Sequence, residues 1–427
     1  MENSQNKLFG RFLIVWVGQL ISSIGSGLTA FSLGIYAYQK THTASSFALV
    51  TLCTFLPSIL LSPIGGVLAD RFDRRVMMIL GDLGSALGLV LILIIMLTGN
   101  IELWQIYIGT AISSVFVALQ GPAYKASVTD LLTEDQFSKA SGLVQLASSS
   151  KFLISPIISG LLLSITGIET VLTIDISTFA IAILAVFFIK KDLQIVDKNY
   201  ESQHFMKNLA EGWDAIASNR GVVFLIMIIS IVTFFIGFLQ TLFGPLVLSF
   251  SDSKTLGIAQ SISAIGMLLS SLYIGIFSKT EKYADMVIIG LSFSGLFFSL
   301  IGLTSNIYFI VGATFLFFYA LSFVNTGCDV LVRKNIDNDK QGRVWGIIAV
   351  LSQLGSVVAY CISGFLADHI FNPLLNKGGF LVPTVGKIIG TGQGRGIGLL
   401  FIISGAFVVI LAFITSRFKS IRALVNN

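Results

Sequence analysis

The sequence is poor in charged residues and in cysteine, and each shortage excludes a class of protein. Only 11% of its 427 residues are charged, whereas a water-soluble globular domain carries about 25%. A soluble globule is therefore excluded. The three cysteines, Cys53, Cys328 and Cys361, all lie within hydrophobic stretches, so no disulfide framework is indicated.

Catalytic and nucleotide-binding motifs are also missing. The three histidines, His42, His204 and His369, fall in loops or at the ends of hydrophobic stretches, so no H-E-x-x-H site lies in a membrane span. The glycine-rich run from Gly390 to Gly398 fits neither G-x-x-x-x-G-K-[ST] nor G-x-G-x-x-G. We therefore expect neither an enzyme nor an ATP-driven pump, and we predict no cofactor and no metal ion.

Apolar residues make up 54% of the chain and fall in stretches of about twenty or more residues, the length that crosses a bilayer. The sequence thus predicts an all-α membrane protein with twelve transmembrane helices. Their expected ranges are 12–38, 44–69, 76–98, 102–123, 140–165, 169–189, 221–249, 256–278, 285–304, 307–328, 344–367 and 397–416.

The basic residues between these stretches alternate in number. If the N-terminus is cytoplasmic, 21 of the 27 Lys and Arg residues lie inside, five lie outside and Lys151 lies within a span. Lys and Arg concentrate in cytoplasmic loops, so this asymmetry favours an even number of spans with both termini in the cytoplasm. We expect a multi-pass protein of the bacterial cytoplasmic (inner) membrane.

The longest polar segment, residues 190–220, separates the sixth span from the seventh. It predicts two pseudo-symmetric six-helix bundles, residues 1–189 and 221–427, joined by a cytoplasmic linker. Apolar residues at helical spacing in the linker predict a short amphipathic helix, lying either on the membrane surface or against neighbouring loops. They are Phe205, Leu209, Trp213 and Ile216.

Two echoing phrases indicate a partial internal duplication. Gly66-Val-Leu-Ala-Asp70 ends the second span, and Gly364-Phe-Leu-Ala-Asp368 ends the eleventh, on the side expected to be external. Related six-helix halves are expected to leave such traces in a transporter sequence.

A very short basic link, GGVLADRFDRR at residues 65–75, joins the second and third spans. It resembles the G-x-L-a-D-R-x-g-R-[KR] loop between the second and third helices of the major facilitator superfamily. Longer phrases, among them FLPSILLSPIGGVLADRFDRR, GPAYKASVTDLL and IDISTFAIA, resemble its macrolide-efflux-type, drug:proton antiporter branch. The resemblance implies a conformational latch, in which Asp70 meets the start of the eleventh span near Arg343. The latch residues would be Gly66, Asp70, Arg71, Arg74 and Arg75.

The fifth span carries Ser155-Pro156-Ile-Ile-Ser159-Gly160, a degraded form of the G-P-x-x-G-G pattern of antiporters in this superfamily. Proline bends a helix and small residues permit close helix approach, so we predict a gate hinge at Pro156 and Gly160. The fourth span lacks the arginine that many proton-coupled exporters of the superfamily carry there, so coupling must use another charged group.

Three charged residues lie within predicted spans. Asp175 lies roughly 9 Å from the outer end of the sixth span, and Asp82 lies at a similar depth from the inner end of the third. Ionisable residues inside a membrane are costly and are functional candidates, so both acids are candidates for proton coupling. Asp82 has the alternative of an ion pair that holds the short loop. Lys151 either pairs with one of these acids or faces a cavity and attracts an anionic group.

Polar and aromatic residues in two spans are candidates for a substrate cavity. The first span has one polar stripe, which either lines a cavity or hydrogen-bonds to neighbouring helices. In the seventh span, aromatic and amide side chains either pack in the core or line a cavity for a bulky lipophilic solute. The candidates are Gln19, Ser22, Ser26, Thr29, Tyr36, Lys151, Phe234, Phe238 and Gln240.

These observations predict a secondary transporter that exports lipophilic or amphipathic small molecules by alternating access, in exchange for protons. We expect a monomer in the lipid bilayer with no nucleic-acid partner. The alternative is an exporter or flippase of an anionic amphiphile, such as a siderophore or lysophospholipid, with Lys151 as the anion contact. An intramembrane enzyme or a non-transporting sensor is a remote alternative.

Overall fold

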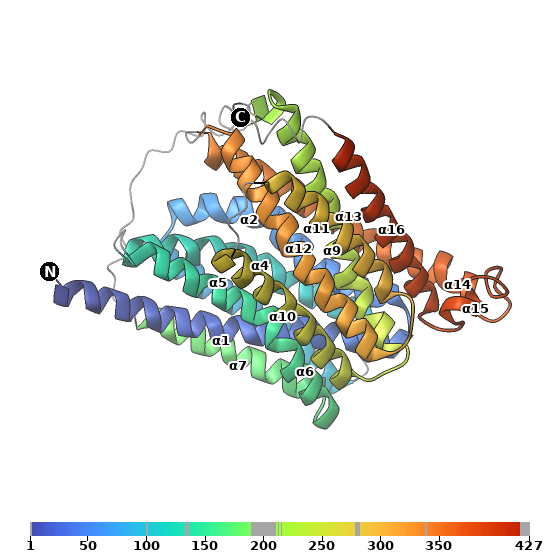
Figure 1. Cartoon of the computed structure of the whole chain (residues 1–427). Coiled ribbons are helices and arrows are strands. Elements are labelled where there is room, and N and C mark those ends of the chain that lie inside the picture. The colour runs from blue at the N-terminus through green and yellow to red at the C-terminus, as the bar shows by residue number, and fades with distance from the viewer. Residues whose placement is uncertain are drawn as a thin grey trace. The chain divides into compact units, whose positions relative to one another are not determined.

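The computed structural model describes residues 2–99, 101–132, 136–188, 216–277, 282–337 and 340–418, together with Glu211, Trp213 and Asp214. All regular elements among these residues are helical, because a backbone in lipid must pair its own N–H and C=O groups. Twelve helical segments in the described ranges are long and apolar enough to cross a membrane. The predicted all-α membrane fold is therefore confirmed (Figure 1).

The chain divides into two compact units. The first unit holds the described residues up to 188, apart from Thr43–Ser45, and also Asp252–Ser261. Its helices are α1 (Glu2–Thr41), α2 (Ala44–Arg71), α3 (Arg74–Thr98), α4 (Leu103–Leu131), α5 (Phe137–Leu153), α6 (Ser155–Ile165) and α7 (Ile168–Phe187).

The second unit holds Thr43–Ser45 and the remaining described residues. Its elements are α9 (Arg220–Leu248), α10 (Ser253–Phe277), α11 (Tyr283–Ile301), α12 (Ile307–Asn335), α13 (Gln341–Phe365), the π-helical turn η2 (Leu366–Phe371), α14 (Asn372–Leu375), α15 (Gly386–Ile389) and α16 (Arg395–Arg417). The beginning of α10 belongs to the first unit.

In the first unit, α1 packs along α7, and α3 packs along α4 and α7. Glycines permit the closest approach between α3 and α4. A Cβ at Gly88 would lie 2.5 Å from the carbonyl oxygen of Gly109, and one at Gly81 would lie 2.6 Å from Cβ of Gln120. Membrane helices associate through such small-residue contacts because lipid supplies no hydrophobic drive between them.

In the second unit, α9 packs along α13, and α11 packs along α12 and α16. Its core is aromatic, with the Phe298 ring at the centre. That ring lies 5.0 Å from the Phe401 ring, 5.1 Å from the Phe317 ring and 6.1 Å from the Phe235 ring, between centroids. Tilted and edge-to-face ring pairs at these distances are the favourable arrangements.

Several spans differ from their predicted ranges. The helices of the fourth and tenth spans continue to Leu131 and Asn335, beyond the predicted ends at 123 and 328, and the helix of the first begins at Glu2, before residue 12. The fifth is interrupted at Ile154, between α5 and α6, because Pro156 has no N–H to continue the hydrogen-bond ladder. The eleventh does not end at residue 367 but continues through η2 and α14 to Leu375.

The linker prediction falls mostly outside the described residues, which include neither Phe205 nor Leu209. Of its other two apolar positions, Trp213 is 53% exposed and Ile216 is buried. The boundaries of the two predicted bundles, with a linker at 190–220, remain a prediction.

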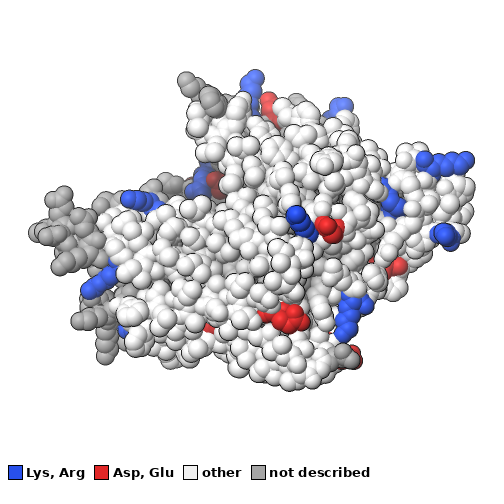
Figure 2. All heavy atoms as spheres, turned by 90° about the horizontal axis from the view of Figure 1, so that it is seen from below, with Lys and Arg blue, Asp and Glu red and all other residues white. Residues whose placement is uncertain are grey.

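Uncharged residues make up most of the face shown in Figure 2. Large apolar side chains are exposed on the described helices, including Leu97, Ile165, Phe187 and Ile276. Extensive exposed apolar surface is abnormal for a soluble monomer and expected of helices that face lipid.

Candidate functional site

Asp175 lies on α7 in the first unit and is only 1% exposed. Its Oδ1 accepts a hydrogen bond from Thr178 Oγ1 at 3.2 Å, while its Oδ2 has no hydrogen-bond partner among the described residues. Helix α1 covers this carboxylate at Gly25, where a Cβ would lie 2.6 Å from Oδ1. Thr29 of α1 is buried near the same carboxylate, outside hydrogen-bond geometry. The acid is thus enclosed between α1 and α7.

Asp82 lies on α3 and is 2% exposed. Its Oδ2 accepts a hydrogen bond from Nε2 of Gln19 on α1 at 3.4 Å. Gln19 Oε1 in turn accepts from Nε2 of Gln120 on α4. These side chains form a polar connection through three helices of the first unit. Within the described part of the chain, no basic group pairs with Asp82, so its contact is with an amide.

Lys151 lies on α5 and is partly buried. Its ammonium lies 5.4 Å from the centroid of the Phe55 ring on α2, a cation–π arrangement. It also attracts the Asp175 carboxylate electrostatically, although among the described residues no carboxylate forms an ion pair with it within 4 Å. The close contact of Lys151 is therefore with the Phe55 ring, while Asp175 acts on it only through longer-range attraction.

The polar stripe of α1 divides into two parts. Gln19, Ser22 and Thr29 are buried within the first unit, whereas Ser26 and Tyr36 are partly exposed. Tyr36 lines a cavity of about 380 Å³ in the first unit. The other side chains of this cavity include Gln39, Lys40, Met96 and Glu169. Both expected roles therefore occur along the stripe: Gln19 hydrogen-bonds to a neighbouring helix, and Tyr36 lines a cavity.

The predicted hinge region contacts two other helices. Ser155 Oγ donates to the carbonyl of Ile24 at 2.9 Å, and Ser159 Oγ donates to that of Leu28 at 3.2 Å, so the serines bind the backbone of α1. Pro156 and Gly160 face the beginning of α10. A Cβ at Gly160 would lie 2.6 Å from the carbonyl oxygen of Ser253. The hinge role itself remains a prediction.

In the second unit, the Phe234 and Phe238 rings lie 4.8 Å apart between centroids. Phe238 is 3% exposed and belongs to the aromatic core, while Phe234 is partly exposed. Gln240 accepts a hydrogen bond from the hydroxyl of Tyr360 on α13. Tyr360 was not among the predicted residues, because nothing in the sequence indicates which side chain of α13 faces α9.

The basic loop at residues 65–75 is anchored within the first unit by its arginines. Arg74 Nη1 donates to the carbonyl of Ala126 on α4 at 2.9 Å. Arg75 Nη2 donates to the carbonyl of Phe187, the last residue of α7, where a cation complements the helix dipole. The Asp70 side chain is 64% exposed and lies 3.9 Å from Arg74 Nη2. Asp70 therefore remains accessible on the surface of the unit.

The other predicted latch residues have different surroundings. Arg71 is exposed, and nothing lies within 4 Å of a Cβ built at Gly66. Gly65 is the packed glycine, because a Cβ there would lie 2.1 Å from the carbonyl oxygen of Ala118 on α4. The loop's Asp73 accepts from the N–H of Arg75 at 2.8 Å and caps α3.

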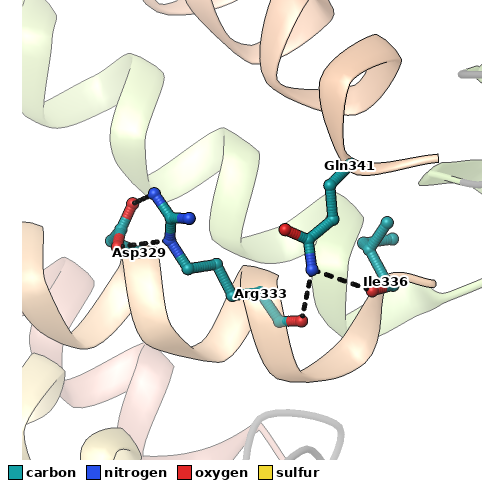
Figure 3. Close-up of polar contacts among 4 residues, drawn as sticks. All are labelled: Asp329, Arg333, Ile336 and Gln341. Carbon is teal, nitrogen blue, oxygen red and sulfur yellow. Dashed lines mark hydrogen bonds and ion pairs between the residues drawn. The ribbon is translucent and has the colours of Figure 1, made fainter. Parts of the chain in front are cut away.

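The turn between α12 and α13 forms a further polar cluster (Figure 3). Arg333 Nε donates to Asp329 Oδ2 at 2.8 Å, and the Arg333 guanidinium also stacks over the Trp345 ring at 5.3 Å. Gln341 Nε2 donates to the carbonyl of Arg333 in the last turn of α12 at 3.1 Å and to that of Ile336, the residue that follows α12, at 3.3 Å. The pair of Asp329 and Arg333 was not predicted, although its i,i+4 spacing is a signal that the sequence carries.

The described residues contain no metal site. No group of three or more His, Cys, Asp or Glu side chains within the described residues is suited to hold a metal ion. The buried polar groups that the structure describes in the first unit donate and accept hydrogen bonds between and within helices.

Comparisons with known proteins agree with this architecture. Macrolide efflux protein A of Streptococcus pyogenes is 23% identical over 423 residues, covering 97% of each chain. The uncharacterized MFS-type transporter YfiS of Bacillus subtilis is 26% identical over 413 residues, covering 94% of this chain and 92% of its own. The crystal structure of the nucleoside transporter NupG superposes with a TM-score of 0.74 at 16% identity, covering 95% of this chain and 98% of that one.

The family assignment is given by a sequence profile. The profile of the Major Facilitator Superfamily matches residues 15–360, which is most of the chain and includes parts of both units. The protein therefore belongs to the Major Facilitator Superfamily and is a secondary membrane transporter, not an enzyme.

Proposed function

We propose that this transporter exports lipophilic or amphipathic small molecules of the macrolide type across a bacterial cytoplasmic membrane, in exchange for protons. The name of the Streptococcus pyogenes relative, macrolide efflux protein A, supports the substrate class. The observation that carries the proposed coupling is Asp175, which is buried with one carboxylate oxygen unpartnered in the described part of the chain.

The surroundings of Asp175 suit a site that gains and loses a proton. A buried carboxylate is costly as an anion, and here one hydroxyl and a distant ammonium offset that cost only in part. A proton bound at Oδ2 makes the group neutral without displacing the Thr178 hydrogen bond to Oδ1. Opening the contact between α1 and α7 to water would permit the proton to leave. If Asp175 is exposed to water first on one side of the membrane and then on the other, proton transfer would be coupled to solute transport.

Asp82 is the weaker candidate for coupling. Its Oδ2 already accepts from Gln19, which is itself held by Gln120. A group held in this way contributes to the packing of three helices, so its replacement should first affect stability. The comparison of Asn substitutions at Asp82 and Asp175 therefore separates a structural acid from a coupling acid.

Each unit has its own candidates for contact with the solute. Lys151 and Phe55 supply a cation against a ring in the first unit, and Phe234 and Gln240 supply partly exposed aromatic and amide groups in the second. Ligand sites are mostly apolar with a few polar groups that orient the ligand, and side chains of both kinds are present in this set.

The test is a drug-susceptibility panel on cells with and without the protein, repeated with a protonophore. Expression should raise the tolerated concentration of erythromycin and other bulky amphiphiles, and the protonophore should abolish the difference. Intracellular accumulation of the same compounds should fall when the protein is present. Equal susceptibility and equal accumulation across the panel would contradict the proposal.

Export of an anionic amphiphile is the second candidate, and Lys151 favours it. An ammonium beside a ring inside a span can bind a phosphate or carboxylate head while the ring contacts an acyl chain. Lys151→Ala should then impair transport of lysophospholipid and spare erythromycin. Lys151→Arg keeps the charge and is the matched control. If both substrates are transported equally by all three proteins, this second candidate is wrong.

A further inference from the structure

Asp368 binds the beginning of a helix from which it is separated by more than 300 residues. It lies in the π-helical turn η2, which follows α13. Its Oδ1 accepts from the N–H of Ala44 at 2.9 Å, and its Oδ2 accepts from the N–H and the hydroxyl of Ser45 at 2.7 and 2.6 Å. Ala44 is the first residue of α2. A carboxylate at this place satisfies N–H groups that have no partner within the helix and complements the helix dipole.

The division of the chain makes this contact unusual. Thr43–Ser45 belong to the second unit, together with Asp368, whereas α2 from Ser46 onward belongs to the first. Asp368 therefore holds, inside the second unit, the first turn of a helix whose remainder is part of the first unit. The chain before this turn is sharply bent, with His42 at a φ of 54°. The three hydrogen bonds thus lie within the second unit, and the chain passes from Ser45 directly into the first unit at Ser46.

The sequence supplies a second, independent observation. Asp368 ends the phrase Gly364-Phe-Leu-Ala-Asp368, which echoes Gly66-Val-Leu-Ala-Asp70 at the end of α2. The two aspartates thus follow similar phrases, one in the last turn of α2 and the other just after α13. In this structure Asp368 is engaged by backbone N–H groups, and Asp70 is exposed with one contact to Arg74 at 3.9 Å.

We propose that Asp368 is a positioning residue for transport: it caps the first turn of α2 in one state of the cycle and releases it in another. It would be the counterpart, on the side expected to be external, of the role that the sequence analysis assigned to Asp70. This inference rests on the proposed alternating access. The retained hydrogen bonds stabilise one state, and their release is required for the other.

Hydrogen–deuterium exchange tests the contact without any transport assay. In the purified full chain, Asp368→Ala should speed exchange of the Ala44 and Ser45 amides about fivefold or more, the effect of losing a helix N-cap. Asp252→Ala is the matched control, because Asp252 caps the start of α10 through the Thr255 N–H at 2.8 Å. That control should leave exchange at Ala44 and Ser45 unchanged. Unchanged exchange in Asp368→Ala would overturn the proposed cap.

A reversible crosslink tests the release. In a chain with Cys53, Cys328 and Cys361 replaced, a Ser45→Cys, Asp368→Cys pair is oxidised in membrane vesicles, and erythromycin transport is measured before and after reduction. Oxidation should reduce transport at least tenfold, and reduction should restore it to the level of the unoxidised pair. A Thr241→Cys, Ser363→Cys pair, which replaces a contact at 2.7 Å inside the second unit, should transport equally in both forms.

The outcomes separate this inference from the proposed function. Full transport by the oxidised Ser45–Asp368 pair would show that the contact never opens, and would overturn the release. If the unsubstituted protein transports no erythromycin, the proposed substrate fails, while the exchange measurement still decides whether Asp368 caps α2. If the reduced pair is itself inactive, Asp368→Ala, which removes the capping oxygens, replaces it, and the accessibility of a Thr43→Cys thiol to an impermeant maleimide becomes the measurement. That accessibility should rise about fivefold; an unchanged rate would contradict the release.

Discussion

Gly25 of α1 lies directly against the carboxylate of Asp175 on α7. A Cβ at residue 25 would lie 2.6 Å from Asp175 Oδ1 and 2.3 Å from Thr178 Oγ1. Contacts shorter than 3.0 Å do not persist, so either the helices or the acid must move when a methyl group is added there. The glycine thus fixes the distance at which α1 covers the buried acid.

The first prediction follows from this contact. Gly25→Ala should lower proton-coupled efflux several-fold and destabilise the protein by about 1–3 kcal/mol, as overpacking does. Gly10→Ala in the same helix is the control, because nothing lies within 4 Å of a Cβ there. Both are measured by thermal unfolding in detergent and by efflux from vesicles. Equal behaviour of the two variants would show that the contact at Gly25 is not restrictive.

The second prediction concerns the two adjacent glycines at the end of α2. Gly65→Ala should destabilise the protein by about 1–3 kcal/mol, because its Cβ would meet the backbone of α4 at the Ala118 carbonyl, 2.1 Å away. Gly66→Ala meets open space and should be neutral or stabilising by up to about 1 kcal/mol, the helix preference for alanine. Thermal unfolding decides between them. A larger loss for Gly66→Ala than for Gly65→Ala would contradict the packing.

The third prediction concerns the polar connection through Gln19. Gln19→Leu removes the donor to Asp82 and the acceptor for Gln120, leaving buried polar groups unpaired at about 1–3 kcal/mol. Adding Gln120→Leu should cost less than the sum of the single changes, since residues in one network are coupled. A double-mutant cycle of unfolding free energies measures this coupling. Strict additivity would show that the chain of hydrogen bonds is absent.

The fourth prediction is a pH dependence. Hydrogen bonds from the Thr255 hydroxyl and backbone N–H lower the pKa of Asp252 below its usual value. A lowered folded pKa means that the carboxylate stabilises the fold above its unfolded pKa of about 3.9, and that this stabilisation is lost as the pH falls through the folded pKa. Asp252→Ala should therefore cost about 1 kcal/mol at pH 7, and less as the pH drops below about 4. Asp252→Asn, which retains a capping oxygen, should cost less at pH 7. If the difference in unfolding free energy between Asp252→Ala and the unsubstituted protein did not change with pH, this prediction would be wrong.

Most of the fold was predictable from the sequence because the membrane imposes simple rules. Backbones in lipid must be helical, a span needs about twenty apolar residues, and these rules are local. The break at Ile154 was also signalled, by Pro156. The continuation of the eleventh span through η2 to Leu375 was not, because a proline such as Pro373 commonly follows a helix end. Here η2 includes His369, and Pro373 takes an early position in α14.

The candidate site was predictable only in part. Sequence position gives the depth of Asp82 and Asp175 in their spans, but not which helix each one faces. The direction in which each side chain leaves its helix determines that Gln19 pairs with Asp82 and that Gly25 covers Asp175. Likewise, the echo ending at Asp368 was visible, while its contacts with the start of α2 depend on residues far apart in the chain. Long-range packing, not local propensity, determines these pairs.

Proton movement through Asp175 can be measured directly in proteoliposomes that contain a pH-sensitive dye and hold an imposed proton gradient. Addition of erythromycin should dissipate the gradient with the unsubstituted protein and with Asp82→Asn, provided that the latter folds. Asp175→Asn should bind erythromycin with an unchanged dissociation constant and leave the gradient intact. Dissipation by Asp175→Asn at the rate of the unsubstituted protein would contradict proton coupling at this residue.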